Sequence, residues 1–243
     1  MRIVYIASAQ ARAATRTKVL MSFIRFHQHA SSRRLVFIRR LCSETSGQKL
    51  KIYTRQGDKG VSSTFSGQRL PKDNDVFEAV GTTDELNSTI GLAREFCLEH
   101  EAATHGGKVV GMLQEIQSRL FEVGAHVATP RNKATPTKQA RTEFGEHHSV
   151  ELEKWIDELD ADLPQLANFI LPSGGKASAT LHLARTVCRR AERRVVPLYR
   201  ADMVEQGVTK YLNRLSDFLF TAARFVAQKE GKEEVIFRPE NDK

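Results

Sequence analysis

The stretch VVGMLQEIQSRLFEVGAHV, residues 109 to 127, carries the clearest structural signal in this chain. Its apolar residues recur at intervals of three and four positions, at Val109, Met112, Leu113, Ile116, Leu120, Val123 and Val127. An α-helix places residues with this spacing on one face, whereas a strand, with its period of two, does not. The stretch therefore predicts an amphipathic helix that buries one face against other helices.

Further helices are predicted on both sides of this stretch. A first helix is expected from Asp75 to about His100, and the sequence Thr82-x-x-Glu85 is a capping box that opens or re-caps it. Later helices are expected over residues 152 to 159, from Gly175 to about Val196 and from Val208 to about Gln228. Five helices with short connections indicate an all-α fold built as a helical bundle.

Two segments show no helical period. Residues 49 to 67 are rich in Gly, Ser and Thr, with short β-favouring runs at Ile52-Tyr53 and Thr64-Phe65, and they predict a loop or a small hairpin. Residues 130 to 148 contain two prolines and many polar residues, and they predict a flexible insert.

The first 46 residues differ in composition from the rest of the chain. They contain nine arginines and lysines and no acidic residue before Glu44, so the net charge of +8 is concentrated here and the remainder is close to neutral. This composition is typical of a mitochondrial transit peptide. We expect a leader, 1–46, cleaved between Cys42 and Gly47, and a mature domain, 47–243. A basic arm for nucleic acid or lipid is the alternative, although such arms usually carry denser blocks of charge.

The composition argues against several classes of protein. No apolar run approaches the roughly 20 residues that a membrane-spanning helix needs. The three cysteines, Cys42, Cys97 and Cys188, form no CxxC motif, so neither a disulfide framework nor a structural zinc site is expected. A nucleic-acid-binding protein is disfavoured because the mature chain lacks an excess of cations.

Two glycine-containing segments invite comparison with phosphate-binding loops. Residues 174 to 176, Gly-Gly-Lys, are not a Walker A loop, because that motif needs glycine in place of Ile170 and serine or threonine in place of Ala177. Residues 54 to 60, followed by Ser62-Ser63, concentrate glycines, hydroxyls and cations that are able to wrap phosphates. This composition alone is not specific.

The helix from Gly175 to Val196 combines a buried seam with a row of arginines. Its apolar arc contains Leu181, Ala184, Cys188, Ala191 and Val195. The arc is bordered by Arg185, Arg189, Glu192 and Arg193. Arg190 and Arg194 lie farther round the helix, on a face expected to be solvated. Guanidinium groups beside a packed seam suit a polyphosphate. Glu192 is then placed either to orient an arginine or to lie near Mg²⁺.

The last helix carries a second group of polar residues. Its apolar stripe contains Tyr211, Leu212, Leu215, Leu219, Ala222 and Val226. Asn213, Asp217 and Arg224 are expected together on the side away from this stripe, with Phe220 near them. An exposed phenylalanine beside polar groups indicates a partner surface. Plain solvent exposure is the alternative for Asn213 and Asp217, and periodicity does not decide between the two.

Four ordered blocks of the sequence carry a family resemblance. They are YTRQGDKGVSSTFSGQRLPKD (53–73), FEAVGTTDELNSTIG (77–91), FILPSGGKASATLHLARTVCRRAERRVVPL (169–198) and YLNRLSDFLFTAAR (211–224). Together they resemble the PduO-type ATP:cob(I)alamin adenosyltransferases, and the leader makes the mitochondrial animal-type branch the most similar. The resemblance implies a five-helix bundle that assembles as a homotrimer with active sites between neighbouring subunits. Asn213, Asp217 and Phe220 would then face an interface.

The resemblance implies an ATP site in which Mg²⁺ bridges the phosphates. Its residues would be Thr54, Arg55, Gln56, Gly57, Ser62, Ser63 and Lys72 from the N-terminal segment and Arg189, Arg190, Glu192, Arg193 and Asn213 from the helices. Arg189, Arg193 and Asp217 would be the catalytic residues, and Glu192 the magnesium ligand. Similar proteins often have threonine where this chain has Gln56, which removes a hydroxyl that would contact phosphate and keeps the backbone N–H.

The resemblance also implies a cobalamin site that uses Phe169 and Phe220. Phe169 would lie against the lower face of the corrin, where an apolar ring excludes the axial base and favours four-coordinate cobalt. An ordinary core phenylalanine is the alternative. Loss of the axial ligand makes Co(II) easier to reduce, and the resulting Co(I) attacks C5′ of ATP while triphosphate leaves. Such a reaction depends on positioning and charge stabilisation more than on an acid or a base.

A non-catalytic carrier is the main alternative to an enzyme. It would keep the bundle and pass adenosylcobalamin to an acceptor, although the intact set Arg189, Glu192, Arg193 and Asn213 argues against carriage alone. For the enzyme, the expected partners are a cobalamin-dependent mutase of the methylmalonyl-CoA mutase type and a cobalamin reductase or other reductant. The expected location is the mitochondrial matrix.

Overall fold

The computed structural model describes residue 53, residues 55–104 and residues 107–240. The expected leader and Thr54 lie outside these residues. The chain divides into two compact units between Lys59 and Gly60, and the fold below is that of the second unit. Its elements are β1 (Val61–Ser63), β2 (Arg69–Pro71), α3 (Asp75–Thr104), α4 (Gly107–Val127), the 3₁₀ helix η1 (Arg131–Lys133), α5 (Pro136–Arg141), α6 (His147–Asp160), α7 (Gly175–Arg200) and α8 (Gln206–Lys229).

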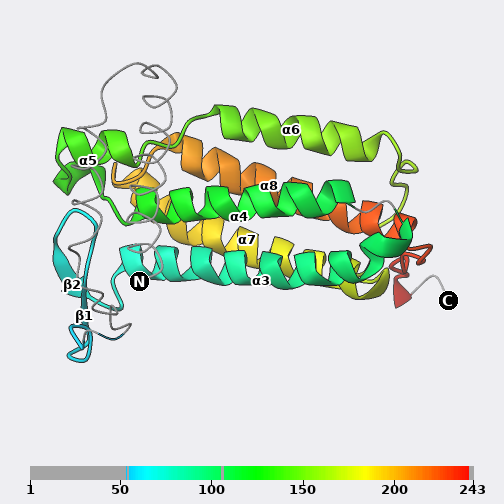
Figure 1. Ribbon diagram of the computed structural model, residues 1–243, viewed down its shortest axis with the longest axis horizontal. Helices are drawn as coiled ribbons and strands as arrows, with labels where there is room; N and C mark the ends of the chain where they lie inside the picture. Colours follow the sequence, from blue (N-terminus) through cyan, green and yellow to red (C-terminus); the bar gives the residue numbers. More distant parts are fainter. Residues whose placement is uncertain (1–52, 54, 105–106, 241–243) are drawn as a thin grey trace, which may run out of the picture. The chain divides into compact units, whose positions relative to one another are not determined.

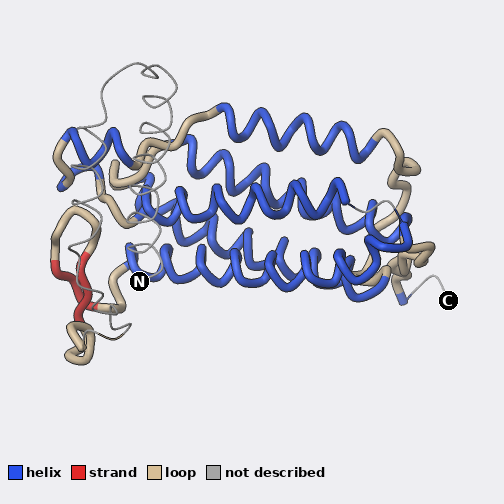
Figure 2. Tube along the Cα trace, viewed as in Figure 1, coloured by secondary structure: helices blue, strands red, loops and turns tan. Residues whose placement is uncertain are grey.

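Five long helices of this unit lie side by side with their axes roughly aligned (Figure 1). α7 packs against both α3 and α8, α3 also packs against α4, and α6 packs against α8. Helix dominates the trace, and the two short strands stand at one end of the bundle (Figure 2). The predicted all-α bundle is confirmed. Among the described helices, none is both long enough and apolar enough to cross a membrane.

The buried faces of the helices are those that the apolar spacing predicts. All seven periodic residues of α4 are buried, from Val109 to Val127. The predicted arc of α7 and the predicted stripe of α8 are buried as well. Each fully buried Leu, Ile or Val side chain stabilises the fold by about 1.5–3 kcal/mol. The core is therefore a set of facing apolar stripes, and it holds the polar edges of α7 and α8 in fixed register.

The first helix begins at a different cap from the predicted one. The side chain of Asn74 accepts a hydrogen bond of 3.1 Å from the backbone N–H of Val76, and α3 starts at Asp75. Thr82 lies inside the continuous helix, where its hydroxyl donates to the carbonyl of Glu78 at 2.7 Å. The prediction that Thr82-x-x-Glu85 caps the helix is therefore wrong.

The segment before α3 forms the small hairpin that composition predicts, although the predicted run Thr64-Phe65 lies in its turn and Ile52 lies outside the described residues. β1 and β2 pair antiparallel, with Val61 opposite Pro71 and Ser63 opposite Arg69. The chain reverses between them, where the backbone N–H of Thr64 donates to the carbonyl of Gln68 at 2.8 Å. The turn uses Gly67 with a φ of 97°, a left-handed conformation that glycine adopts without strain.

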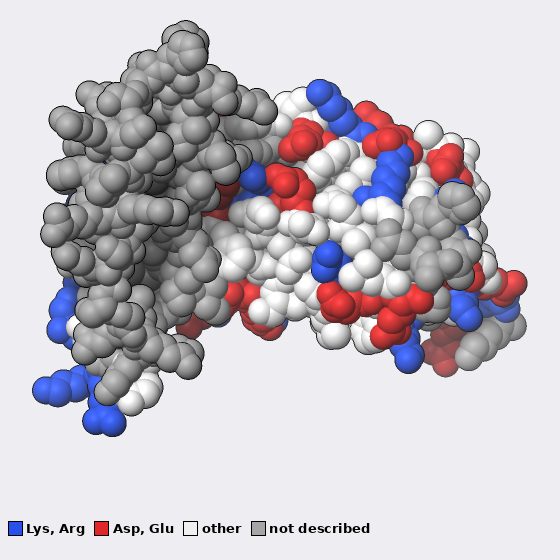
Figure 3. All heavy atoms as spheres, viewed as in Figure 1, with Lys and Arg blue, Asp and Glu red and all other residues white. Residues whose placement is uncertain are grey.

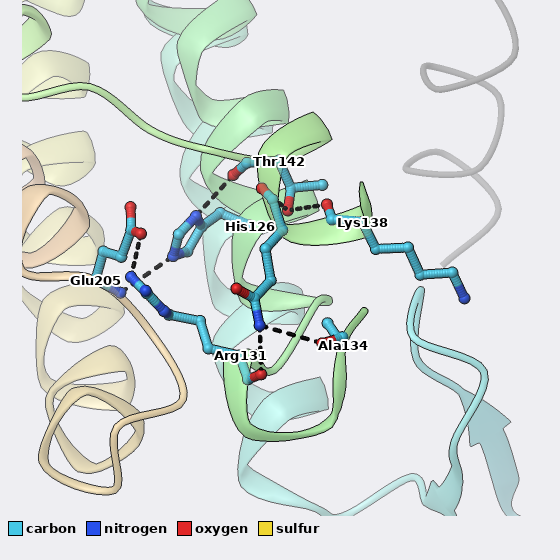
Figure 4. A network of polar contacts seen from close by, with 7 residues as sticks. His126, Arg131, Ala134, Lys138, Thr142 and Glu205 are labelled. Atoms are coloured by element: carbon cyan, nitrogen blue, oxygen red, sulfur yellow. Dashed lines mark hydrogen bonds and ion pairs between the residues drawn. The ribbon is translucent and has the colours of Figure 1, made fainter. Parts of the chain in front are cut away.

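The segment from 130 to 148 differs from the predicted flexible insert. It contains η1 and α5, and its last residues form the start of α6. Several hydrogen bonds link it to α4 and to the turn between α7 and α8 (Figure 4). The spacing of apolar residues did not reveal this structure, because short polar helices are held by hydrogen bonds rather than by a buried face.

Acidic and basic side chains are interspersed over the described residues of the face shown in Figure 3. Among the described residues, several charged side chains form ion pairs, such as that of Arg119 with Glu115 at 2.9 Å and with Glu122 at 2.7 Å. Exposed pairs of this kind contribute about 0–1 kcal/mol each to stability. They belong to the surface of the bundle and do not mark a site.

Candidate functional site

Two exposed arginines, Arg189 and Arg193, lie one helical turn apart on α7. Residues four positions apart share one face of a helix, so the two guanidinium groups point to the same side. Neither side chain forms an ion pair or a hydrogen bond with any residue that the structure describes. Because like charges one turn apart repel each other, a bound polyanion would be favoured by both.

The two neighbouring arginines of α7 are directed elsewhere. Arg190 is half-buried and forms an ion pair with Glu85 of α3. Arg194 lies with its Nη2 atom 3.8 Å from Oε2 of Glu78, also on α3. The side chain of Arg190 is 43% exposed, so it lies on a solvated face as the sequence predicts, and the ion pair with Glu85 is the part that was not predicted. The structure places this residue beside α3 and does not bring it together with the exposed arginines.

Glu192 is joined to α8 by a hydrogen bond. The amide of Asn213 donates to Oε1 of Glu192 at 3.0 Å, as expected for two polar residues on facing helix edges. Glu192 is half-buried, whereas Asn213 is exposed. In the sequence Glu192 lies between Arg189 and Arg193. Its second carboxylate oxygen, Oε2, forms no hydrogen bond or ion pair within the described residues.

Asp217 belongs to a three-residue ionic cluster. It accepts a hydrogen bond of 2.6 Å from Nη1 of Arg214, whose Nε donates to Glu153 of α6 at 2.9 Å. The hydrogen bond to Glu153 is the largest cause that raises the pKa of Arg214 above its ordinary value, and the hydrogen bond to Asp217 raises it further. Arg214 was not among the predicted site residues, although its position three residues before Asp217 on a helix is a signal for such a pair.

Phe220 lies against an aromatic and cationic group on α7. Its ring centroid is 5.8 Å from that of His182 in an edge-on arrangement, and 6.0 Å from the guanidinium carbon of Arg185. His182 is only 3% exposed, and burial together with the nearby Arg185 lowers its pKa to about 4. Nδ1 of this histidine is buried with no hydrogen-bond partner among the described residues. His182 was not predicted as a site residue, because helical spacing alone places it on the side of α7 opposite the apolar arc.

Phe169 presents its ring to the outside of the bundle. It is 83% exposed, so the alternative of a core phenylalanine is wrong. The backbone around it is held by the C-terminal segment: its carbonyl accepts from the N–H of Phe237 at 2.8 Å, and Ile170 bridges to Ile236. An exposed aromatic ring on a supported backbone is a suitable apolar contact for a ligand.

Arg224 is not part of the polar side of α8 that the sequence predicts. It is 5% exposed, and its Nη2 donates to the carbonyl of Pro164 at 2.9 Å. Its Nε lies 3.4 Å from Glu234 in the C-terminal segment. The structure therefore separates this arginine from Asn213 and Asp217, because two segments outside α8 cover it.

The expected ATP residues of the N-terminal segment fall in both compact units. In the bundle unit, Ser62 is half-buried and Ser63 exposed on β1, while the exposed Lys72 follows β2 and its N–H donates to the carbonyl of Gly60 at 2.9 Å. Arg55, Gln56 and Gly57 belong to the first unit. There the guanidinium of Arg55 lies 5.7 Å from the ring of Tyr53. The hairpin stands at the end of the bundle where α3 and α8 begin (Figure 1).

The described residues contain no cluster of three or more His, Cys, Asp or Glu side chains that would hold a metal ion alone. Mg²⁺ is commonly bound in a different way, through one or two carboxylates together with substrate phosphates and water. Glu192 fits this second mode, because it offers one carboxylate oxygen on the same helix as two unpaired arginines.

One face of α7 therefore changes in character along its length. The exposed cations Arg189 and Arg193 occupy the part nearer the hairpin, and the group of Arg185, His182 and Phe220 follows toward the helix start. The start of α7 at Gly175 lies roughly 20 Å along the helix from Arg189, at a rise of 1.5 Å per residue. The loop with Phe169 precedes this start. The arrangement suits a ligand, or a pair of ligands, with an anionic part and a large apolar part.

Comparisons with known proteins agree with such a pair of ligands. A family model described as cobalamin adenosyltransferase matches residues 52–226. The chain is similar to the corrinoid adenosyltransferase MMAB of Mus musculus, with 53% identity over 81% of each chain, and to that of Homo sapiens, with 54% identity over 77% of this chain and 73% of the relative. A variant of the PduO-type ATP:corrinoid adenosyltransferase from Lactobacillus reuteri, solved complexed with cobalamin and ATP, has a TM-score of 0.70 and 35% identity, over 78% of this chain and 100% of that chain.

Proposed function

Because this chain belongs to the cobalamin adenosyltransferase family, we propose that it transfers the 5′-deoxyadenosyl group of ATP to the cobalt of cob(I)alamin. The products are adenosylcobalamin and triphosphate. The observation that carries the proposal is the exposed pair Arg189 and Arg193, which is unpaired among the described residues and lies on the same helix as Glu192, whose carboxylate accepts a hydrogen bond from Asn213. The two arginines are suited to bind the triphosphate group of ATP, which leaves as one anion in this reaction.

Arg189 and Arg193 bind the triphosphate part of ATP. Guanidinium groups present planar forks of donors to phosphate oxygens, and these contacts strengthen as negative charge grows on the leaving group. Ser62, Ser63 and Lys72 would add donors from the hairpin. Glu192 would hold Mg²⁺, which offsets phosphate charge when it is bound.

The chemical step is a displacement at carbon. The electron pair of Co(I) forms a bond to C5′ of ATP, and the C5′–O bond breaks with its electron pair passing to the triphosphate. No proton needs to move at the reacting carbon, so the protein requires no general base there. Its contribution is to hold cobalt and C5′ in line and to stabilise the departing charge.

Phe169 and Phe220 form the corrin side of the site. Phe169 offers a ring that is 83% exposed, which an incoming corrin would cover. An apolar ring at the lower face leaves no ligand for cobalt, and four-coordinate Co(II) accepts an electron from a reductase more readily. Asp217, tied to Arg214, lies on α8 one turn before Phe220 and would orient the adenosyl part between the two ends.

We further propose a homotrimer with active sites between subunits. Glu85 and Arg190 pair across α3 and α7, and two turns farther along this face the exposed residues are Leu92 and Leu183. They are 50% and 53% exposed, which is unusual for leucines at adjacent positions on packed helices. Coverage by a neighbouring subunit would remove this apolar surface from water.

The composition of the N-terminus supports a proposal for the cellular setting. We propose that residues 1–46 direct the chain to the mitochondrial matrix and are then removed, leaving 47–243. Adenosylcobalamin would pass there to a cobalamin-dependent mutase of the methylmalonyl-CoA mutase type.

The proposed function is tested by an anaerobic assay. The purified chain is mixed with ATP, Mg²⁺ and chemically reduced cobalamin, and the absorption of Co(I) is followed together with released triphosphate. Equal amounts of adenosylcobalamin and triphosphate would establish the transferase. Binding of ATP and corrinoid without turnover would instead support a non-catalytic carrier, and binding of neither would overturn both.

A further inference from the structure

We propose that the connection between α4 and α6, residues 128–146, braces the hairpin against the bundle, and that Lys138 positions the hairpin for ATP. This inference rests on the proposed function in one respect, namely that Ser62 and Ser63 of the hairpin contact ATP. The contacts that fix the hairpin against the bundle do not depend on the proposed function.

The tip of the hairpin is fastened at two points. Nζ of Lys138, on α5, donates to the carbonyl of Ser66 at 3.1 Å and lies 5.9 Å from the ring centroid of Phe65. The backbone N–H of Phe65 donates to the carbonyl of Ala128 at the end of α4, at 2.7 Å. A two-stranded hairpin is only marginally ordered alone, so these contacts determine where it lies.

α5 is itself fixed by a network of polar contacts (Figure 4). The amide of Gln139 donates to the carbonyl of Arg131 at 2.7 Å and to that of Ala134 at 3.1 Å. The carbonyl of Thr142, after α5, lies 2.7 Å from Nδ1 of His126 on α4. A helix of six residues does not persist without such support, so the network gives Lys138 a defined origin.

The same network holds the turn between α7 and α8. Arg131 forms an ion pair with Glu205, and its N–H donates to the carbonyl of Met203 at 3.1 Å. Nε2 of His126 accepts from the N–H of Glu205 at 3.1 Å. His126 is therefore neutral and carries its proton on Nδ1, which donates to Thr142.

These contacts join the two parts of the proposed ATP site. The hairpin carries Ser62 and Ser63, whereas α7 and α8 carry Arg193 and Asn213 on either side of the braced turn. A single connection thus contacts both the hairpin and the turn that joins α7 to α8, while the apolar core holds the two helices themselves. The hydrogen bond from Lys138 to the carbonyl of Ser66 links this connection to the hairpin.

Removal of this link should affect binding rather than chemistry. Lys138 is half-buried at the edge of the molecule and contributes nothing to the apolar core. Without it, the hairpin would occupy its binding position for only part of the time, and the apparent affinity for ATP would fall by that fraction. Saturating ATP would restore the position, so the rate at saturation would be kept.

The test compares Lys138→Met with Lys138→Arg, which keeps a charged donor, and with Lys133→Met on η1 as a matched control. In the full chain, Lys138→Met should raise the KM for ATP about 5–20-fold, with kcat and the KM for cob(I)alamin within twofold of wild type. Lys138→Arg should recover most of the affinity, and Lys133→Met should behave as wild type. Lys138→Gln serves as a second variant if the methionine variant is poorly soluble.

Hydrogen exchange supplies a readout that does not depend on catalysis. The amides of residues 61–71 should exchange faster in Lys138→Met than in wild type, while those of α7 and α8 should not change. Faster exchange with an unaltered KM for ATP would overturn the role of Lys138 in ATP binding, and unaltered exchange would overturn the brace. A wild-type chain without adenosyl transfer would refute the proposed function and leave the exchange result standing.

Discussion

The side-chain amide of Asn213 on α8 donates a 3.0 Å hydrogen bond to the carboxylate of Glu192 on α7. This bond draws Glu192 toward α8, so the nearby Arg189 and Arg193 stay free of ion pairs within the described residues. Two unpaired cations and one half-occupied carboxylate are then available to an incoming ligand. The predictions for the anionic end of the site follow from this arrangement.

Arg189→Ala and Arg193→Ala are each expected to reduce kcat about 10²–10³-fold, because each removes a donor to the developing charge on triphosphate. Both side chains are exposed, so neither change should alter the subunit assembly or lower stability by more than about 0.5 kcal/mol. Arg194→Ala is the matched control on the same helix and should change the rate less than twofold. Steady-state adenosyl transfer measures this, and near wild-type rates in both variants would refute the phosphate assignment.

Glu192→Gln is expected to raise the Mg²⁺ concentration for half-maximal rate roughly tenfold, because an amide is a weaker ligand of this ion than a carboxylate. The glutamine oxygen still accepts from Asn213, so the helices should remain joined. Titration with Mg²⁺ at saturating ATP gives the value. Glu143→Gln, at an exposed carboxylate between α5 and α6, is the control, and an equal response in the two variants would remove Glu192 from the metal site.

Phe169→Ala is expected to leave ATP affinity unchanged and to abolish most of the four-coordinate Co(II) signal of the bound corrinoid. The ring is 83% exposed, so its loss should not measurably destabilise the fold. EPR and optical spectra of Co(II) corrinoid bound in the presence of ATP report the coordination state. Leu166→Ala, which shortens another exposed apolar residue of the same loop, should retain the signal. Identical spectra for wild type and Phe169→Ala would exclude the proposed corrin contact.

The buried faces of the bundle were predictable from sequence, because burial of a helix is recorded in the spacing of its own residues. The seven apolar positions from Val109 to Val127 are an example. The start of α3 at Asp75 was predicted as well, whereas its cap was not, because Asn74 and Thr82 both have side chains that can cap a helix. Which of them does so depends on where the chain enters the bundle.

The site was predictable in part for the same reason. The place of Arg189 and Arg193 at the border of the buried seam follows from their angle to the apolar arc of α7. The partner of Arg190 does not, because Glu85 is 105 residues away in the chain. Nor does burial of Arg224, which depends on Pro164 and on a C-terminal segment that returns to the bundle. Contacts between distant segments leave no periodic trace in the sequence.

The buried His182 should make stability depend on pH. Its pKa is lowered to about 4 in the folded chain, so the native state binds fewer protons than the unfolded state between about pH 4 and 6.5. Its contribution is complete above pH 6.5 and is lost as the pH falls toward 4. Between pH 7.5 and 5.0 the free energy of unfolding should fall by about 2 kcal/mol more in wild type than in His182→Gln. Urea unfolding measures this, with His147→Gln as the exposed control, and equal losses in wild type and His182→Gln would contradict it.

Gly174 is required by the packing of α7 against α8. It precedes α7 with a φ of 85°, and a Cβ atom there would lie 2.6 Å from Cβ of Ala227 on α8. Gly174→Ala should therefore lower the free energy of unfolding by roughly 2–4 kcal/mol, through backbone strain and forced separation of α7 from α8. Gly111→Ala, at an exposed position of α4 with no atom within 4 Å of the added carbon, should instead stabilise the chain by about 0.5–1 kcal/mol. Thermal unfolding of both variants measures these changes. Equal changes in Tm would mean that the close approach of α7 and α8 at Gly174 does not contribute to stability.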